Sequence, residues 1–103
     1  MPKEVKEKQL ATFAPLYEGM SREKMEETVL IDGGLAAMQL MLVARAYGYD
    51  TNPIGGFDRE HLVESLGLDP KRYLPVMIVS IGKAAESGYK SVRLPVEEVT
   101  FWR

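Results

Sequence analysis

Residues 35–47 constrain the fold more than any other part of the chain, because only Gln39 and Arg45 interrupt their apolar character. A helix with one apolar stripe can lie on a protein surface. A helix that is apolar around most of its circumference has to be surrounded by other elements. The segment is shorter than the roughly 20 apolar residues of a membrane span, and it contains Arg45. It therefore predicts the core helix of a protein rather than a membrane helix.

Three further helices are predicted around this core helix. Their boundaries follow from capping residues and from the glycines and prolines that end helices. Charged residues dominate the second helix, which indicates a solvated surface helix. The expected helices are 3–14, ended by Pro15; 22–27, capped by Ser21; the core helix, capped by Asp32 and ended by Gly48; and a short amphipathic helix, capped by Asp58 and ended by Gly67.

Residues 74–82 form the clearest strand pattern. Their continuous apolar character, without alternation, predicts a strand that is covered on both faces. Such a strand needs neighbours on its edges, and the chain shows no second convincing strand. The partners come either from weakly patterned segments, such as an extended piece at 49–51, or from another polypeptide. Residues 69–72 are expected to form a turn and 83–91 a surface loop.

The C-terminal residues 92–103 are predicted to be extended and to end in two large aromatic side chains, Phe101 and Trp102. Large exposed aromatics on a free tail are costly in water. We therefore expect the tail to dock on another surface, such as that of a second subunit.

Length and composition exclude several classes of protein. The chain has 103 residues, which predicts a single domain spanning 1–103. Its formal charge of −2 offers no basic field for nucleic acid or an anionic membrane. It has no cysteine and one histidine, His61, which excludes disulfides, thiolate chemistry and a histidine-cluster metal site within one chain. The charged N-terminus lacks the apolar core of a signal peptide, so we expect a soluble, cytoplasmic protein.

Residues 50–57 contain the pattern with most chemical meaning. Pro53 is rigid, and Gly55 and Gly56 remove side-chain bulk where a backbone could approach a flat ligand with two free amide groups. The same residue types also dominate ordinary turns, so a turn and a binding loop both remain open. His61, on the following helix, is interpreted as an ordinary solvated or hydrogen-bonded helix residue. A general base is the alternative for this side chain.

Four blocks of the sequence, in this order, resemble the FMN-dependent nitroreductase family: 34–42 (GLAAMQLML), 48–58 (GYDTNPIGGFD), 79–84 (VSIGKA) and 93–95 (RLP). The resemblance runs from about residue 17 to the end and covers only the C-terminal half of a typical member. It implies an α+β, nitroreductase-like fold that is helix-rich and truncated, with a partial central sheet completed by dimerisation. Family members place FMN at the interface of two interlocked chains.

The resemblance also implies a cofactor site. The loop of Pro53, Ile54, Gly55 and Gly56 is expected to lie along the flavin ring, with the two glycine amides donating hydrogen bonds to it. Arg93 matches the family's C-terminal basic residue that holds the flavin phosphate. A lysine common two positions earlier is replaced here by Ser91, with Lys90 adjacent. No catalytic side chain and no metal are expected.

The activity implied is two-step hydride transfer, from NAD(P)H to FMN and then to a nitroaromatic or quinone acceptor. The family's N-terminal half, with an Arg-Ser-x-Arg-type phosphate grip and an asparagine that contacts the flavin, has no counterpart in these residues. A homodimer or a complementing N-terminal half is the expected partner. The alternative is a non-enzymatic, homodimerising fragment that binds flavin weakly or not at all.

Overall fold

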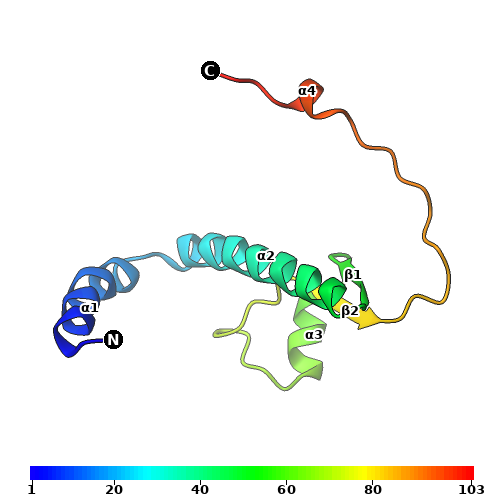
Figure 1. The fold of residues 1–103 in the computed structure, drawn as a ribbon. Coiled ribbons are helices and arrows are strands. Elements are labelled where there is room, and N and C mark those ends of the chain that lie inside the picture. The colour runs from blue at the N-terminus through cyan, green and yellow to red at the C-terminus, as the bar shows by residue number, and fades with distance from the viewer.

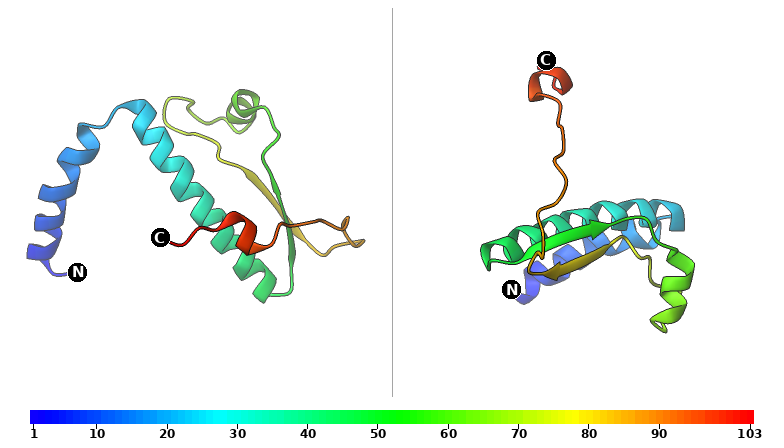
Figure 2. Two further views of the ribbon diagram at one scale, coloured as in Figure 1. Left: turned by 90° about the horizontal axis from the view of Figure 1, so that it is seen from above. Right: turned by 90° about the vertical axis from the view of Figure 1, so that its right-hand side faces the viewer.

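The computed structural model describes residues 1–103 as four helices and two strands (Figure 1). A long helix lies against a small sheet, while the N-terminal helix and the C-terminal tail extend away from this centre (Figure 2). In chain order the elements are α1 (Lys3–Glu18), α2 (Arg22–Ala46), β1 (Asp50–Ile54), α3 (Arg59–Ser65), β2 (Ile78–Gly82) and α4 (Val96–Val99).

Helix α2 is a single helix of 25 residues, where the sequence predicted two helices. The Ser21 cap is confirmed, since its side chain accepts a hydrogen bond from the Lys24 amide at 3.2 Å. The prediction that Asp32 caps a second helix is wrong, because Asp32 lies in the interior of α2. Gly48 follows the helix with φ +78°, a left-handed conformation that glycine adopts at little cost, which confirms it as the stop.

Close packing explains why a glycine sits inside α2. A Cβ atom added at Gly33 would lie 2.7 Å from Cγ2 of Val76, in the segment that leads into β2. A side chain at this position would therefore push the helix away from that segment. Gly33 marks a helix contact, although the same residue type predicts a helix boundary when the sequence is considered alone.

We expect Gly33→Ala to lower the free energy of unfolding by about 1–2 kcal/mol, because overpacking against the stiff Val76 outweighs the gain in helix propensity. Gly34→Ala is the matched control. A Cβ there meets no atom within 4 Å, so this variant should stabilise by up to about 1 kcal/mol. Urea denaturation followed by circular dichroism measures both changes. Equal stabilisation by the two variants would contradict the packing role of Gly33.

Helix α1 continues through Pro15 to Glu18, so the prediction that Pro15 ends it is wrong. Proline removes its own N–H donor, which leaves the Ala11 carbonyl without its helical partner. Ala11 is exposed, and water can satisfy that carbonyl. The Pro15 carbonyl still accepts a hydrogen bond from the Gly19 amide at 3.1 Å, which closes the last turn.

Strands β1 and β2 pair antiparallel in a two-stranded sheet, from Asp50 opposite Gly82 to Ile54 opposite Ile78. Residues 50 and 51 of the weakly patterned segment at 49–51 thus belong to a real partner strand, which extends to Ile54 and includes Pro53. Regular pairing of the predicted strand 74–82 begins only at Ile78. The expectation that this strand is covered on both faces is wrong for these 103 residues, since Ile81 is 49% exposed.

The 103 residues do not cover their own apolar surface. Only Ala44, on α2, and Val63, on α3, are buried. The accessible surface is 9590 Å², whereas a compact monomer of this mass exposes about 5,800 Å². The radius of gyration is 19.0 Å, against about 13 Å for a compact domain of this length. The core helix is therefore present, but its cover is not supplied by this chain.

The length of α2 also changes one expectation about membranes. As one continuous helix it is long and apolar enough to cross a membrane by length and composition alone, so the prediction that it is too short is wrong. This is weak evidence, because the core helix of a soluble protein passes the same test. In these 103 residues α2 contacts β1 and Val76, and only 6% of its apolar window is buried.

The remaining local predictions are confirmed except one: the tail 92–103 is not extended throughout, because Val96–Val99 form the short helix α4, with Glu97 and Glu98 in its first turn where the helix dipole favours acids. The Asp58 side chain caps α3 by accepting a hydrogen bond from the His61 amide at 3.0 Å, and Gly67 follows the helix with φ +64°. Residues 70–72 form the turn, and 83–91 contain no helix or strand. The C-terminal tail contains the single turn α4, and Phe101 and Trp102 are 86% and 93% exposed. Docking of the tail on another chain remains a prediction.

Candidate functional site

The glycine pair lies directly after β1, at the end of the sheet where Ile54 pairs with Ile78. Gly55 and Gly56 are both exposed, and a Cβ atom added to either would meet no atom within 4 Å. Neither has a positive φ. Neither backbone strain nor crowding within this chain therefore requires glycine here, and the pair leaves an open, flat stretch of backbone.

The two glycine amides are free to bind a ligand. In the turn the Gly55 carbonyl accepts a hydrogen bond from the Phe57 amide at 3.2 Å, but neither glycine N–H donates to an acceptor in the chain. Pro53 is exposed in the adjoining strand, and Ile54 is half-buried. The stretch is the end of a strand followed by a short turn, and its two glycine amides have no acceptor within the chain.

Lys90 and Arg93 lie apart from the glycine pair. Residues 83–95, which we call the arm, leave the sheet after Gly82, and Gly82 pairs with Asp50 at the opposite end from Ile54 (Figure 1). Four strand steps of about 3.4 Å separate these two ends by about 14 Å. Arg93 is exposed, and its only hydrogen bond is from its own guanidinium to the Val92 carbonyl at 3.1 Å. The chain alone does not bring the two predicted parts of the site together.

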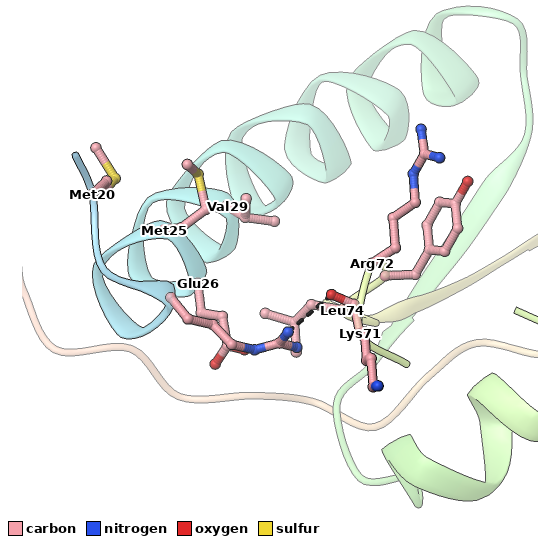
Figure 3. A pocket seen from close by; sticks show the side chains of 9 residues that line it. Met20, Met25, Glu26, Val29, Lys71, Arg72 and Leu74 are labelled. Carbon is pink, nitrogen blue, oxygen red and sulfur yellow. Dashed lines mark hydrogen bonds and ion pairs between the residues drawn. The ribbon is translucent and has the colours of Figure 1, made fainter. Parts of the chain in front are cut away.

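A cavity of the chain lies away from the six predicted site residues. A cavity of ≈ 360 Å³ lies between the start of α2 and the 71–74 segment, with Met25 and Val29 on one side and Leu74 on the other (Figure 3). Arg22 crosses its edge, donating to the carbonyls of Lys71 at 2.9 Å and Pro70 at 3.2 Å. None of the six predicted site residues lines this cavity. The Arg22 guanidinium at this cavity is already paired with Glu26 and with two backbone carbonyls.

A polar junction that the sequence did not reveal joins the end of α2 to the start of β1 and to the residues that follow β2. The Asp50 carboxylate accepts from the Arg45 guanidinium at 2.6 Å and from the Ala84 amide at 3.0 Å. Lys83 donates its Nζ to the Gly48 carbonyl and lies 4.7 Å from the centre of the Tyr49 ring. Arg45 and Asp50 are five residues apart and lie on either side of the helix end. No common sequence pattern predicts that two such residues form an ion pair, so only the fold reveals it.

Two other polar side chains, those of Lys24 and His61, lie on the exposed surface of helices. Hydrogen bonding to Glu27 raises the pKa of Lys24, on the exposed surface near the start of α2. His61 is exposed on α3, and its backbone amide is used by the Asp58 cap. This agrees with the interpretation of His61 as an ordinary helix residue.

A long helix that lies against an antiparallel pair of strands, with two further helices and a tail, is an α+β arrangement. The chain belongs to the nitroreductase family, whose model matches residues 7–83. This match begins earlier than the expected start near residue 17 and ends before the arm residues Lys90 and Arg93. The nitroreductase-like fold class is confirmed by the structural neighbours described next.

Individual relatives support the same assignment. YdgI of Bacillus subtilis (strain 168), which carries the name of an NAD(P)H nitroreductase, is 55% identical over all of this chain and 49% of its own length. The enone reductase of CLA biosynthesis from Lactiplantibacillus plantarum is 46% identical over 88% of this chain and 42% of its own length.

Solved structures match almost the whole chain. A structure from Staphylococcus epidermidis ATCC 12228, named as an NAD(P)H:FMN oxidoreductase, has a TM-score of 0.94 and 48% identity, covering 99% of this chain and 48% of its own. A nitroreductase-type protein of Exiguobacterium sibiricum 255-15, solved in complex with FMN, has a TM-score of 0.92 and 48% identity. It covers 100% of this chain and 49% of its own. The chain spans about half the length of the relatives it matches.

Proposed function

We propose that this chain is the flavin-ring-binding part of an NAD(P)H-dependent oxidoreductase with FMN as cofactor. One observation supports this more than any other: Gly55 and Gly56 present two unused amide donors to open space beside the exposed Pro53. Fixed donors at a ring that gains a hydride and negative charge stabilise that charge without reorganisation. The residues present therefore fit the ring end of FMN.

The phosphate end has fewer groups available. In this chain only Arg93 and Lys90 are proposed to bind it, and Arg93 can form two parallel hydrogen bonds with phosphate oxygens. Pro53 and Ile54 are proposed to form the wall next to the ring. No protein acid or base is assigned, because bound FMN supplies the redox chemistry and the protein supplies donors, orientation and exclusion of water.

The proposed reaction uses one site twice. NAD(P)H is the hydride donor, and a nitroaromatic or quinone accepts the electrons after the nicotinamide has left. The names of the relatives support this class, since they include NAD(P)H nitroreductases, an NAD(P)H:FMN oxidoreductase and an enone reductase. A cytoplasmic location is proposed with it, because the nicotinamide donor is a cytoplasmic metabolite.

The site is proposed to be completed by a second chain. The exposed apolar side chains of α2 include Leu35, at 67%, and Leu42, at 56%, and such a surface favours association. The partner is a second copy of this chain or a polypeptide equivalent to the missing half of the relatives. Either would cover α2 and give the tail aromatics Phe101 and Trp102 a surface to dock on.

The second candidate function is a non-enzymatic, homodimerising fragment. The same exposed helix favours it, together with the small number of phosphate-binding groups. The two proposals differ in flavin binding: addition of FMN to the purified chain should shift and quench the flavin spectrum if the first is correct, and leave it unchanged if the second is correct.

A further inference from the structure

We propose that Asp50 is a positioning residue that fixes where the arm leaves the sheet, and thereby where Arg93 can reach. Asp50 is the first residue of β1 and uses both carboxylate oxygens. Oδ1 accepts from Nη1 of Arg45, in the last turn of α2, at 2.6 Å, and Oδ2 accepts from the amide of Ala84 at 3.0 Å. One carboxylate therefore ties the end of the long helix to the start of the arm.

Lys83 strengthens the same attachment from the neighbouring position. Its Nζ donates to the Gly48 carbonyl and lies over the ring of Tyr49. Two consecutive arm residues are thus held at the point where the arm begins. Beyond Ala84, no hydrogen bond or ion pair joins residues 85–103 to the rest of the chain. The junction is the last fixed point before Lys90 and Arg93.

The energetics indicate which bond of the junction matters more. The Arg45 and Asp50 side chains are 75% and 42% exposed, and exposed ion pairs contribute little. The charged hydrogen bond to the Ala84 backbone is stronger than a neutral one and acts on the arm directly. Releasing it increases the number of arm conformations, which raises the entropic cost of bringing Arg93 to a ligand.

The junction is tested first without flavin, by amide hydrogen exchange in Asp50→Ala and Asp50→Asn. Loss of the charged hydrogen bond should speed exchange at Ala84 by about fivefold to tenfold in Asp50→Ala, with a smaller change in Asp50→Asn. Asp69→Asn is the matched control: Asp69 also accepts from a backbone amide, that of Lys71 at 2.9 Å. It should leave Ala84 unchanged. Unchanged exchange at Ala84 in both Asp50 variants would overturn the proposal.

The second measurement rests on the proposed function and compares FMN with riboflavin, which lacks the phosphate. Asp50→Ala should weaken FMN binding by about threefold to tenfold and leave riboflavin binding unchanged, because only the arm reaches the phosphate. Equal weakening of both flavins would indicate general damage to the fold and would overturn the positioning role. If the unaltered chain binds neither flavin, the proposed function fails, and the Ala84 exchange rate still decides whether the junction holds the arm.

Discussion

Gly56→Val is expected to remove most FMN binding while leaving the fold intact. The position has open space for a side chain and no positive φ, so valine causes neither a clash nor backbone strain within the chain. The same side chain would stand where the proposed flavin ring approaches the two amides. Losing two hydrogen bonds of about 1 kcal/mol each corresponds to about thirtyfold weaker binding, before any steric exclusion is added.

Flavin fluorescence titration measures this loss, and thermal denaturation by circular dichroism verifies the fold. Lys6→Val is the control, because Lys6 is exposed on α1, outside both the glycine pair and the arm. We expect the control to bind FMN as the unaltered chain does. Wild-type affinity in Gly56→Val would show that the glycine pair is an ordinary turn.

Arg93→Ala is expected to weaken FMN binding by about tenfold to a hundredfold and to leave riboflavin binding unchanged. A hydrogen bond to a charged group contributes about 1.5–3 kcal/mol, and the guanidinium has no competing ion pair in the chain. Arg93→Lys should lose part of the affinity, since a single ammonium group does not form the bidentate contact. Lys90→Ala should have a smaller effect than Arg93→Ala.

The measurement is the ratio of the FMN and riboflavin dissociation constants, because this ratio isolates the phosphate. Arg103→Ala provides the control: it removes the same charge from the same C-terminal region, and it should leave the ratio unchanged. An Arg93→Ala variant that weakens both flavins equally would refute the phosphate role. An Arg93→Ala variant with unaltered FMN affinity would also refute the phosphate role.

Local signals predicted the capped and glycine-ended elements well. Ser21, Asp58, Gly48 and Gly67 act as the sequence indicated, because caps and left-handed stops depend on neighbouring residues only. The Asp32 cap was wrong, because α2 continues through this residue. The packing of Gly33 on Val76 was not predicted, since Val76 is distant in sequence.

The sheet and the site were predictable only in part. Pro53 made β1 look like a loop, yet a proline is tolerated in an edge strand where its missing N–H leaves no ladder bond broken. The glycine pair was found from sequence because its chemistry is local. The junction at Asp50 was not, since Ala84 meets it only through the pairing of β1 with β2.

Burial was the least predictable property. The apolar character of 35–47 and 74–82 predicts surfaces that need cover, but it does not say which polypeptide supplies that cover. In this chain Leu35 and Ile81 remain largely exposed. The sequence therefore predicts the fold of these 103 residues, which match half of a family member, and it predicts that they need a partner chain.

Sedimentation velocity of the purified chain mixed with FMN tests the central proposal most directly. Protein and flavin absorbance are followed separately, with the protein in large excess over the flavin. We expect the flavin to sediment with the protein, in a particle larger than a single chain. Flavin that remains entirely at the boundary of free FMN, while the protein sediments without it, would contradict the proposal that this chain binds FMN.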